Sequence, residues 1–238
     1  MEAAFDRLLP SLCLHCEAPL DRARPALCAA CRGTIVPLPA RSCARCGLPA
    51  SRPVADAGDV AGCPRCRDWP PSLSAVAATR HGGAAAAVIH TLKYRGWRHL
   101  AVLCAELMAQ ALAARGIAPD LYVPVPLHPA RRRARGFNQA ELLAAALARS
   151  GGRPLAHAIE RVRATSPQVG ARLTERRANM RGAFGAIQRL RPDETVALVD
   201  DVATSGATLA AGAEALERAG ARRVVGVTFG LALDPHGR

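Results

Sequence analysis

The sequence predicts an α/β fold, a mainly parallel sheet with flanking helices, preceded by a small cysteine-rich domain. Apolar strand-like runs at 121–125 and 196–199 each end in a polar loop that leads into an alanine- and leucine-rich helical segment, which predicts the sheet. Eight of the nine cysteines lie within the first 66 residues, which sets the small domain apart. Trp69-Pro70-Pro71-Ser72 marks the boundary, so we expect domains at 1–70 and 71–238.

The chain is strongly basic. Its formal net charge is +13 over 238 residues, and Lys93 is the sole lysine among 32 basic residues. Because guanidinium groups suit phosphate and carboxylate ligands, this charge predicts phosphorylated partners, either small ligands or nucleic acid. No apolar run reaches transmembrane length, and residues 1–12 lack the apolar region of a secretory signal. We therefore expect no membrane insertion and a cytoplasmic location.

The cysteines predict two structural metal sites. Eight of them form four C-x-x-C pairs: Cys13/Cys16, Cys28/Cys31, Cys43/Cys46 and Cys63/Cys66. Two thiolates three positions apart can bind one side of a tetrahedral Zn²⁺, and a second pair closes the site. The connecting loops 17–27 and 47–62 are workable for zinc ribbons. We assign the first two pairs to one zinc and the last two to another, while an interleaved pairing remains an alternative.

Redox chemistry is the other use of such pairs. Four copies without a thioredoxin-like βαβ context argue against it. The segment is rich in proline and poor in long periodic stretches, so we expect it to need metal for folding. His15, inside a knuckle, and Cys104, on an apolar helical segment, are expected to be bystanders.

A strand at 75–80 and helices at 84–93 and 99–115 are expected after the boundary, since apolar residues recur there at strand and helix spacings. Lys93-Tyr94-Arg95-Gly96 lies between the two helices. This basic turn either reaches toward a ligand or is a solvated connection, and the residues favour neither reading.

The segment 121–149 predicts the first strand–loop–helix unit. Pro124 donates no ladder hydrogen bond, so we expect it at the end of the strand. Asn138 with Glu141 predicts a capping box for the helix, which should reach about Arg149. The loop between strand and helix contains four arginines: Arg131, Arg132, Arg133 and Arg135. These could form a nucleic-acid patch, but their place at the ligand edge of a sheet favours a pyrophosphate cradle.

The segment 163–182 is longer than a normal connection between strands, which we expect at 155–162 and 196–199. Its length favours a mobile functional loop that folds over a ligand and excludes water. Candidate ligand-binding side chains in it are Arg163, Gln168, Arg172 and Arg176. A last strand is expected at 223–228.

The second strand–loop–helix unit is the centre of the chain. Its strand leads into Asp200 and Asp201, and a helix is expected over 207–219, closed by Gly220. The residues between them are Val202, Ala203, Thr204, Ser205, Gly206, Ala207 and Thr208. This order places the loop at the carboxyl edge of the sheet, where α/β folds bind ligands. Backbone N–H groups, hydroxyls and the helix dipole all favour an anion there.

Two adjacent carboxylates beside an anion site repel each other, and a ligand with a phosphate and two vicinal hydroxyls resolves this conflict. The phosphate would lie in the loop, while Asp200 and Asp201 accept hydrogen bonds from a ribose 2′- and 3′-OH, with Mg²⁺ nearby. An ordinary Asp-Asp strand end followed by a helix cap is the alternative. The loop is not a Walker A loop, because no Gly-Lys-Thr/Ser follows the strand.

Residues 196–208 closely resemble the phosphoribosyl-diphosphate (PRPP) binding signature of type I phosphoribosyltransferases. The whole chain resembles the ComF family. The pattern consists of the four C-x-x-C pairs, Lys93-Tyr94-Arg95-Gly96, Val123-Pro124-Val125-Pro126, Arg135-Gly136-Phe137-Asn138-Gln139, Arg163-Ala164-Thr165-Ser166-Pro167-Gln168 and the PRPP signature, in that order. The family is similar to type I phosphoribosyltransferases with an amino-terminal double zinc ribbon. The resemblance therefore implies that fold, PRPP binding and a link to DNA uptake in natural transformation.

The resemblance implies two function classes. One is a glycosyltransferase that moves a pentosyl group from PRPP to an acceptor nitrogen and releases pyrophosphate with Mg²⁺. Asp200 and Asp201 would then stabilise the ribose, the 203–208 loop would hold the 5′-phosphate, and Arg131–Arg135 with the 163–182 loop would take the pyrophosphate. The other is a PRPP sensor that engages single-stranded DNA or a helicase.

Two features argue against the hypothesis that the protein salvages hypoxanthine or guanine. Thr204 stands where 6-oxopurine salvage enzymes carry an acid/base Asp, and no long hood segment is evident. The sequence identifies neither the acceptor nor the oligomeric state.

Overall fold

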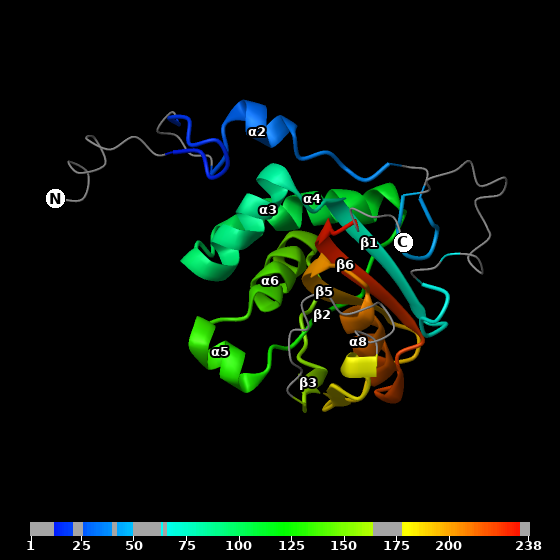
Figure 1. Ribbon diagram of the computed structural model, residues 1–238. Coiled ribbons are helices and arrows are strands. Elements are labelled where there is room, and N and C mark those ends of the chain that lie inside the picture. The colour runs from blue at the N-terminus through cyan, green and yellow to red at the C-terminus, as the bar shows by residue number, and fades with distance from the viewer. Residues whose placement is uncertain are drawn as a thin grey trace.

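A computed structural model of the chain describes residues 12–20, 26–39, 42–49, 63, 66–163 and 178–233. It contains a four-stranded parallel sheet in the order β1-β6-β5-β2 (Figure 1). The strands are β1 (Leu73–Arg80), β2 (Leu121–Pro124), β5 (Thr195–Ala203) and β6 (Arg223–Leu231). Pro124 is the last residue of β2, at the outer side of the sheet, as predicted.

Helices cover both faces of this sheet (Figure 1). One face packs against α3 (Gly83–His90), α4 (Leu100–Ala114) and α6 (Gln139–Gly151). The other packs against α8 (Ala207–Arg218) and a two-stranded antiparallel sheet of β3 (Ile159–Arg161) and β4 (Phe184–Ala186). These layers confirm the predicted fold class, a parallel sheet with flanking helices.

Alternating side chains of the strands pack in two separate cores, because successive residues of a strand point to opposite faces. Along β5, Val196 and Leu198 enter the α8 core, whereas Ala197 and Val199 enter the core under α4 and α6. Helix α8 lies very close to the sheet. A Cβ at Gly212 would lie 2.7 Å from Cδ2 of Leu198, so an alanine there would force the buried Leu198 side chain to shift.

The arginine-rich segment after β2 differs from the prediction. It was expected to be a loop, but most of it forms the short helix α5 (Pro129–Arg135). Pro129 occupies the first turn, where a missing N–H costs nothing, and the His128 side chain caps it by accepting from the N–H of Ala130. Asn138 caps α6 as predicted, because its side chain accepts from the N–H of Ala140 at 3.1 Å.

The strand expected at 155–162 is shorter than predicted, since only residues 159–161 form β3, outside the main sheet. The reason is its partner: β4, which the sequence did not reveal, pairs antiparallel with β3 in a separate small sheet. Helix α3 continues into a π-helical turn, η1 (Thr91–Arg95), which Gly96 ends in the left-handed conformation at φ 69°.

The cysteine-rich segment, with the short helix α2 (Ala29–Gly33), lies along the outer edge of β1. The N–H of Ala75 donates to the carbonyl of Arg45 at 2.7 Å, and the hydroxyl of Thr79 donates to the carbonyl of Val36 at 2.7 Å. Pro37 also forms an antiparallel bridge with Thr79. The segment therefore covers a strand edge that would otherwise expose unpaired backbone groups.

Among the helices that the structure describes, none has the length and apolar character required to cross a bilayer.

Candidate functional site

Two four-cysteine clusters have the geometry of structural zinc sites. Cys13, Cys16, Cys28 and Cys31 form one cluster, and Cys43, Cys46, Cys63 and Cys66 form the other. Within each, all the Sγ atoms lie within 4.8 Å of one another. The first two pairs thus cluster together and the last two pairs cluster together, which is consistent with the predicted zinc assignment.

The sulfur distances fit a tetrahedral ion. Cys16 and Cys28 are 3.7 Å apart, Cys43 and Cys66 are 3.7 Å apart, and Cys46 and Cys63 are 3.6 Å apart. A tetrahedron with Zn–S bonds of about 2.3 Å has edges of about 3.8 Å. The N–H of Cys28 also donates to Sγ of Cys13 at 3.4 Å. Burial raises the pKa of the Cys13 thiol, but the knuckle's N–H donors outweigh it and lower that pKa to about 6.

The predicted anion loop lies between β5 and α8, at the carboxyl edge of the sheet. Gly206 is the N-cap of α8 with φ 75°, a left-handed conformation that favours glycine. The hydroxyl of Ser205 accepts from the N–H of Ala207 at 3.3 Å and is buried, whereas Thr204 is exposed. The loop therefore presents the start of a twelve-residue helix and one exposed hydroxyl to the edge of the sheet.

Asp200 and Asp201 lie at this edge but have different surroundings. As neighbours on a strand, they point to opposite faces of the sheet. Asp201 is buried, and its Oδ2 lies 2.9 Å from Nζ of Lys93, which comes from η1 on the α3 and α4 side. Asp200 is partly exposed, and its charge interacts with Arg161 at the end of β3.

Asp200 lies in an unusual electrostatic environment. Burial, and then the charge of Asp201, raise the pKa of Asp200 to about 7. Burial lowers the pKa of Arg161, and the nearby charge of Arg131 lowers it further. The charges of Asp200 and of Arg131 on α5 therefore both act on Arg161 of β3.

The segment around Tyr94 and the junction between α5 and α6, which are far apart in the sequence, contact each other beside this site. The guanidinium carbon of Arg135 lies 5.5 Å from the ring centre of Tyr94, and that of Arg98 lies 5.1 Å from the ring centre of Phe137. Lys93-Tyr94-Arg95-Gly96 is therefore not a merely solvated connection, because it contacts both Asp201 and the α5–α6 junction.

The other residues predicted to bind the ligand have different surroundings. Arg132 pairs with Glu141 at 3.3 Å, and Arg133 is exposed on α5. Arg163 donates to the carbonyls of Asn179 and Arg181 at 2.8 and 2.6 Å, which joins the two ends of the 163–182 segment. Gln168, Arg172 and Arg176 lie outside the described residues, as does most of the predicted mobile loop.

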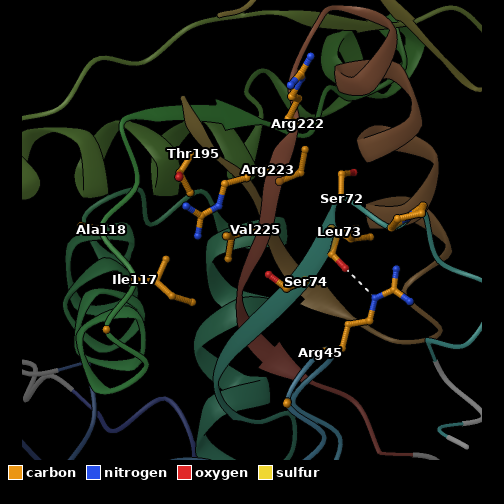
Figure 2. Close-up of a pocket in the computed structure, with 14 residues that line it drawn as sticks. Arg45, Ser72, Leu73, Ser74, Ile117, Ala118, Thr195, Arg222, Arg223 and Val225 are labelled. Atoms are coloured by element: carbon orange, nitrogen blue, oxygen red, sulfur yellow. Dashed lines mark hydrogen bonds between the residues drawn. The ribbon is translucent and has the colours of Figure 1, made fainter. Parts of the chain in front are cut away.

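A pocket of about 680 Å³ lies elsewhere, at the amino ends of β1, β5 and β6 (Figure 2). Its lining includes Arg45, Thr195 and Arg223, and Figure 2 shows Arg45 donating to the carbonyl of Leu73. Because parallel strands place their two ends at opposite edges of the sheet, this pocket is not part of the 203–208 loop.

Comparison with known proteins identifies the family. A double zinc ribbon domain matches residues 4–68. The DNA utilization protein YhgH of Salmonella typhimurium is 36% identical over 202 residues, which span 76% of this chain and 80% of that protein. YhgH of Escherichia coli K12 is 35% identical over 191 residues, with the same coverage. The chain belongs to the ComF/YhgH family.

Another ComF/YhgH relative is competence protein F of Haemophilus influenzae, which is 43% identical over 94 residues, 38% of this chain and 41% of that protein. Two solved structures match at 18% identity. A purine phosphoribosyltransferase from Pyrococcus horikoshii has a TM-score of 0.34 over 54% of this chain and 70% of its own. An adenine phosphoribosyltransferase has a TM-score of 0.36 over 63% and 78%. The relatives confirm the predicted family, and the domain match at residues 4–68 confirms the predicted amino-terminal double zinc ribbon.

The sequence analysis did not assign three residues that lie at or near the candidate site. Arg161 lies in a segment for which the sequence predicted only a strand. Lys93 was considered as a ligand-binding residue but was not assigned to the site. His81, just after β1, is close enough for the charges of Lys93 and Asp201 to act on it, and burial lowers its pKa. The one signal in the sequence was that Lys93 is the sole lysine of an arginine-rich chain.

Proposed function

We propose that this member of the ComF/YhgH family binds PRPP with Mg²⁺ at the carboxyl edge of its sheet and transfers or recognises the phosphoribosyl group. The observation that carries the proposal is the arrangement of β5, the 203–208 loop and α8. Two carboxylates lie near the end of the strand, and a left-handed Gly206 begins a helix a few residues after them. A ligand with both a phosphate and ribose hydroxyls matches these two parts.

Each part of PRPP has a place in this arrangement. The 5′-phosphate would bind the N–H groups and hydroxyls of residues 203–208. Asp200, which is partly exposed, would accept from the ribose hydroxyls, and Asp201 would hold Lys93 toward the ligand. The pyrophosphate with Mg²⁺ would lie toward Arg131 and Arg161, with Arg132, Arg133, Arg135 and the 163–182 segment around it.

In a transfer reaction, the bond between the ribose C1′ and pyrophosphate breaks while an acceptor nitrogen bonds to C1′. Positive charge develops on the ribose, and the two carboxylates would stabilise it electrostatically. Incubation of the purified protein with PRPP, Mg²⁺ and a panel of nucleobases tests this step. Pyrophosphate release that requires one base identifies the acceptor, whereas PRPP binding without any release assigns the site to recognition.

A second candidate function is recognition of PRPP coupled to single-stranded DNA or to a helicase that processes it. The names of the relatives, DNA utilization protein and competence protein, favour a role in DNA utilization. A specific surface favours DNA itself. Tyr94 is 67% exposed, and it stacks with Arg135 beside the pair of Arg98 and Phe137. Aromatic rings interleaved with arginines suit single-stranded nucleic acid.

This second candidate has its own test. Single-stranded DNA binding should weaken steeply with salt, because counterion release dominates such binding. Tyr94→Ala should weaken it several-fold through lost stacking, since one base on an aromatic ring contributes about 1 to 3 kcal/mol. Tyr94→Phe keeps the ring and serves as the control. Binding that does not respond to salt or to Tyr94→Ala would exclude this surface.

We also propose that the division at residues 70 and 71 separates two functional parts that fold against each other. The hydrogen bonds from the N–H of Ala75 to the carbonyl of Arg45 and from the hydroxyl of Thr79 to the carbonyl of Val36 support this view, because they cross the division.

A further inference from the structure

Trp69 lies directly against the anion loop. A Cβ at Gly206 would lie 2.3 Å from Cζ2 and 3.2 Å from Nε1 of Trp69, so the indole contacts the backbone of Gly206 itself. Trp69 is 5% exposed and belongs to the same core as Ala203, Ala207 and Leu209. The floor of the proposed phosphate site is therefore a side chain from the cysteine-rich segment.

The second cysteine cluster holds Trp69 in this position. The N–H of Trp69 donates to the carbonyl of the zinc ligand Cys66 at 3.0 Å. Arg45 lies inside the adjacent knuckle, between Cys43 and Cys46. Its guanidinium donates to the carbonyls of Leu73 at 2.9 Å, Cys66 at 3.1 Å and Trp69 at 2.9 Å, and also to that of Pro70. One guanidinium thus ties the metal cluster, Trp69 and the start of β1 together.

The first cysteine cluster is on the other side of the sheet. Cys13 and Cys31 are buried in the core of α3, α4 and α6, whereas Cys46, Cys66 and Trp69 are buried in the α8 core. The two clusters have the same ligand chemistry, but only the second shares a core with the anion loop. They therefore provide a matched pair for a test.

We infer that Trp69 is a positioning residue for the phosphate loop and that the second zinc cluster, but not the first, sets the conformation of that loop. This inference rests on the proposed function, because it specifies how the PRPP site is held. Loss of the second zinc would release Cys66, then Trp69, and then the backbone at Gly206. A flat ring supports the left-handed turn, and residues 203–208 keep their N–H groups directed at the ligand.

The indole N–H provides a direct signal. Nε1 of Trp69 is buried and has no hydrogen-bond acceptor among the described residues. An unsatisfied buried donor is costly, so a small shift of the loop on phosphate binding that brings a carbonyl within reach is favourable. The resonance of this N–H should therefore respond both to ligand and to the second zinc.

The first experiment compares Cys63→Ser with Cys16→Ser, each of which should lose one zinc. The chain has two tryptophans, and Trp97→Phe assigns their indole ¹⁵N–H resonances. We expect Cys63→Ser to shift the Trp69 resonance, speed amide exchange in residues 203–208 and weaken PRPP binding at least about tenfold, much more than Cys16→Ser does. Equal effects of the two variants, or a lost second zinc without any change at Trp69, would overturn the inference.

The second experiment separates positioning from general destabilisation. Trp69→Leu should weaken binding of PRPP and ribose 5-phosphate about tenfold while Mg²⁺-pyrophosphate binding changes less than twofold, because pyrophosphate does not use the loop. Trp69→Phe, which keeps a flat ring, should restore most of the affinity. Equal losses for all three ligands would indicate general misfolding and contradict the inference.

A parent protein that does not bind PRPP would overturn the proposed function alone. The link between the second zinc and the loop would then be tested by the Trp69 resonance and by amide exchange, because neither measurement needs a ligand.

Discussion

Nζ of Lys93 lies 2.9 Å from Oδ2 of Asp201, and this ion pair joins the η1 turn to the carboxyl end of the central strand. The Asp201 side chain is only 5% exposed, so its charge depends on this partner. The chain uses arginine at its 31 other basic positions. A compact ammonium group fits beside a buried carboxylate where a planar guanidinium would need more space.

Lys93→Met should therefore destabilise the protein and weaken PRPP binding. The variant leaves a buried carboxylate without its partner, which costs about 1 to 3 kcal/mol of unfolding free energy. Adding Asp201→Asn should recover part of that loss, because the uncompensated charge is removed. Denaturant titration of the two single variants and the double variant measures the coupling. Strict additivity would show that the pair contributes nothing.

PRPP binding should depend on pH through Asp200. Burial and the charge of Asp201 raise its pKa to about 7, so the carboxylate that accepts from ribose forms only as the pH rises through that value. Affinity should therefore increase between about pH 6 and 8. Because PRPP phosphates titrate near pH 6 themselves, Asp200→Asn is the control, and its profile should lack the component near pH 7. Parallel calorimetric profiles for parent and variant would contradict this role.

The titration of Asp200 lowers the unfolding free energy as the pH rises, whereas it increases the affinity for PRPP. Between the unfolded pKa of 3.8 and the folded value of about 7, the folded protein holds a proton that the unfolded chain has released. The contribution of Asp200 to stability is thus present at low pH and is lost as the pH rises through 7. In Asp200→Asn, the unfolding free energy should fall less over this range than in the parent.

Metal analysis should find two zinc ions per chain, because two four-cysteine clusters have tetrahedral dimensions. Cys28→Ser should retain one ion, that of the second cluster. Acidification should release both metals, since thiolate ligands take up protons in competition with the ion. A parent with well under one zinc, prepared without chelators, would exclude the assignment.

Gly206→Ala should disrupt the anion loop for two reasons. A left-handed conformation costs about 1 to 2 kcal/mol for alanine, and the new Cβ would collide with the Trp69 ring. Combining Gly206→Ala with Trp69→Leu should remove the collision, so the two changes should be less destabilising together than their sum. Thermal unfolding of the single and double variants measures this coupling. Additive effects would show that the contact carries no energy.

The sequence predicted the parts of the chain where local chemistry decides the structure. C-x-x-C spacing specifies a zinc knuckle, and the order of β5, loop and α8 specifies an edge site, because both depend on neighbouring residues. Pro124 at the end of β2 and the Asn138 cap follow from single-residue rules.

The sequence could not predict features that depend on distant contacts. Arg161 acts on Asp200 only because β3 leaves the main sheet to pair with β4. Trp69 reads as part of a boundary, and its role appears only when the fold places it under Gly206. The opposite orientation of Asp200 and Asp201 also depends on the strand continuing to Ala203, beyond the apolar run.

Calorimetry of the Asp200→Asn, Asp201→Asn double variant tests the central proposal most directly. With PRPP and Mg²⁺, the parent should bind, and the double variant should bind at least about tenfold more weakly, because each lost hydrogen bond to a charged group costs about 1.5 to 3 kcal/mol. The fold should survive with some loss of stability, because Lys93, which loses its partner, is 22% exposed, and because the repulsion between the two carboxylates is removed. If the folded double variant binds PRPP as tightly as the parent, the site lies elsewhere and the proposed function is wrong.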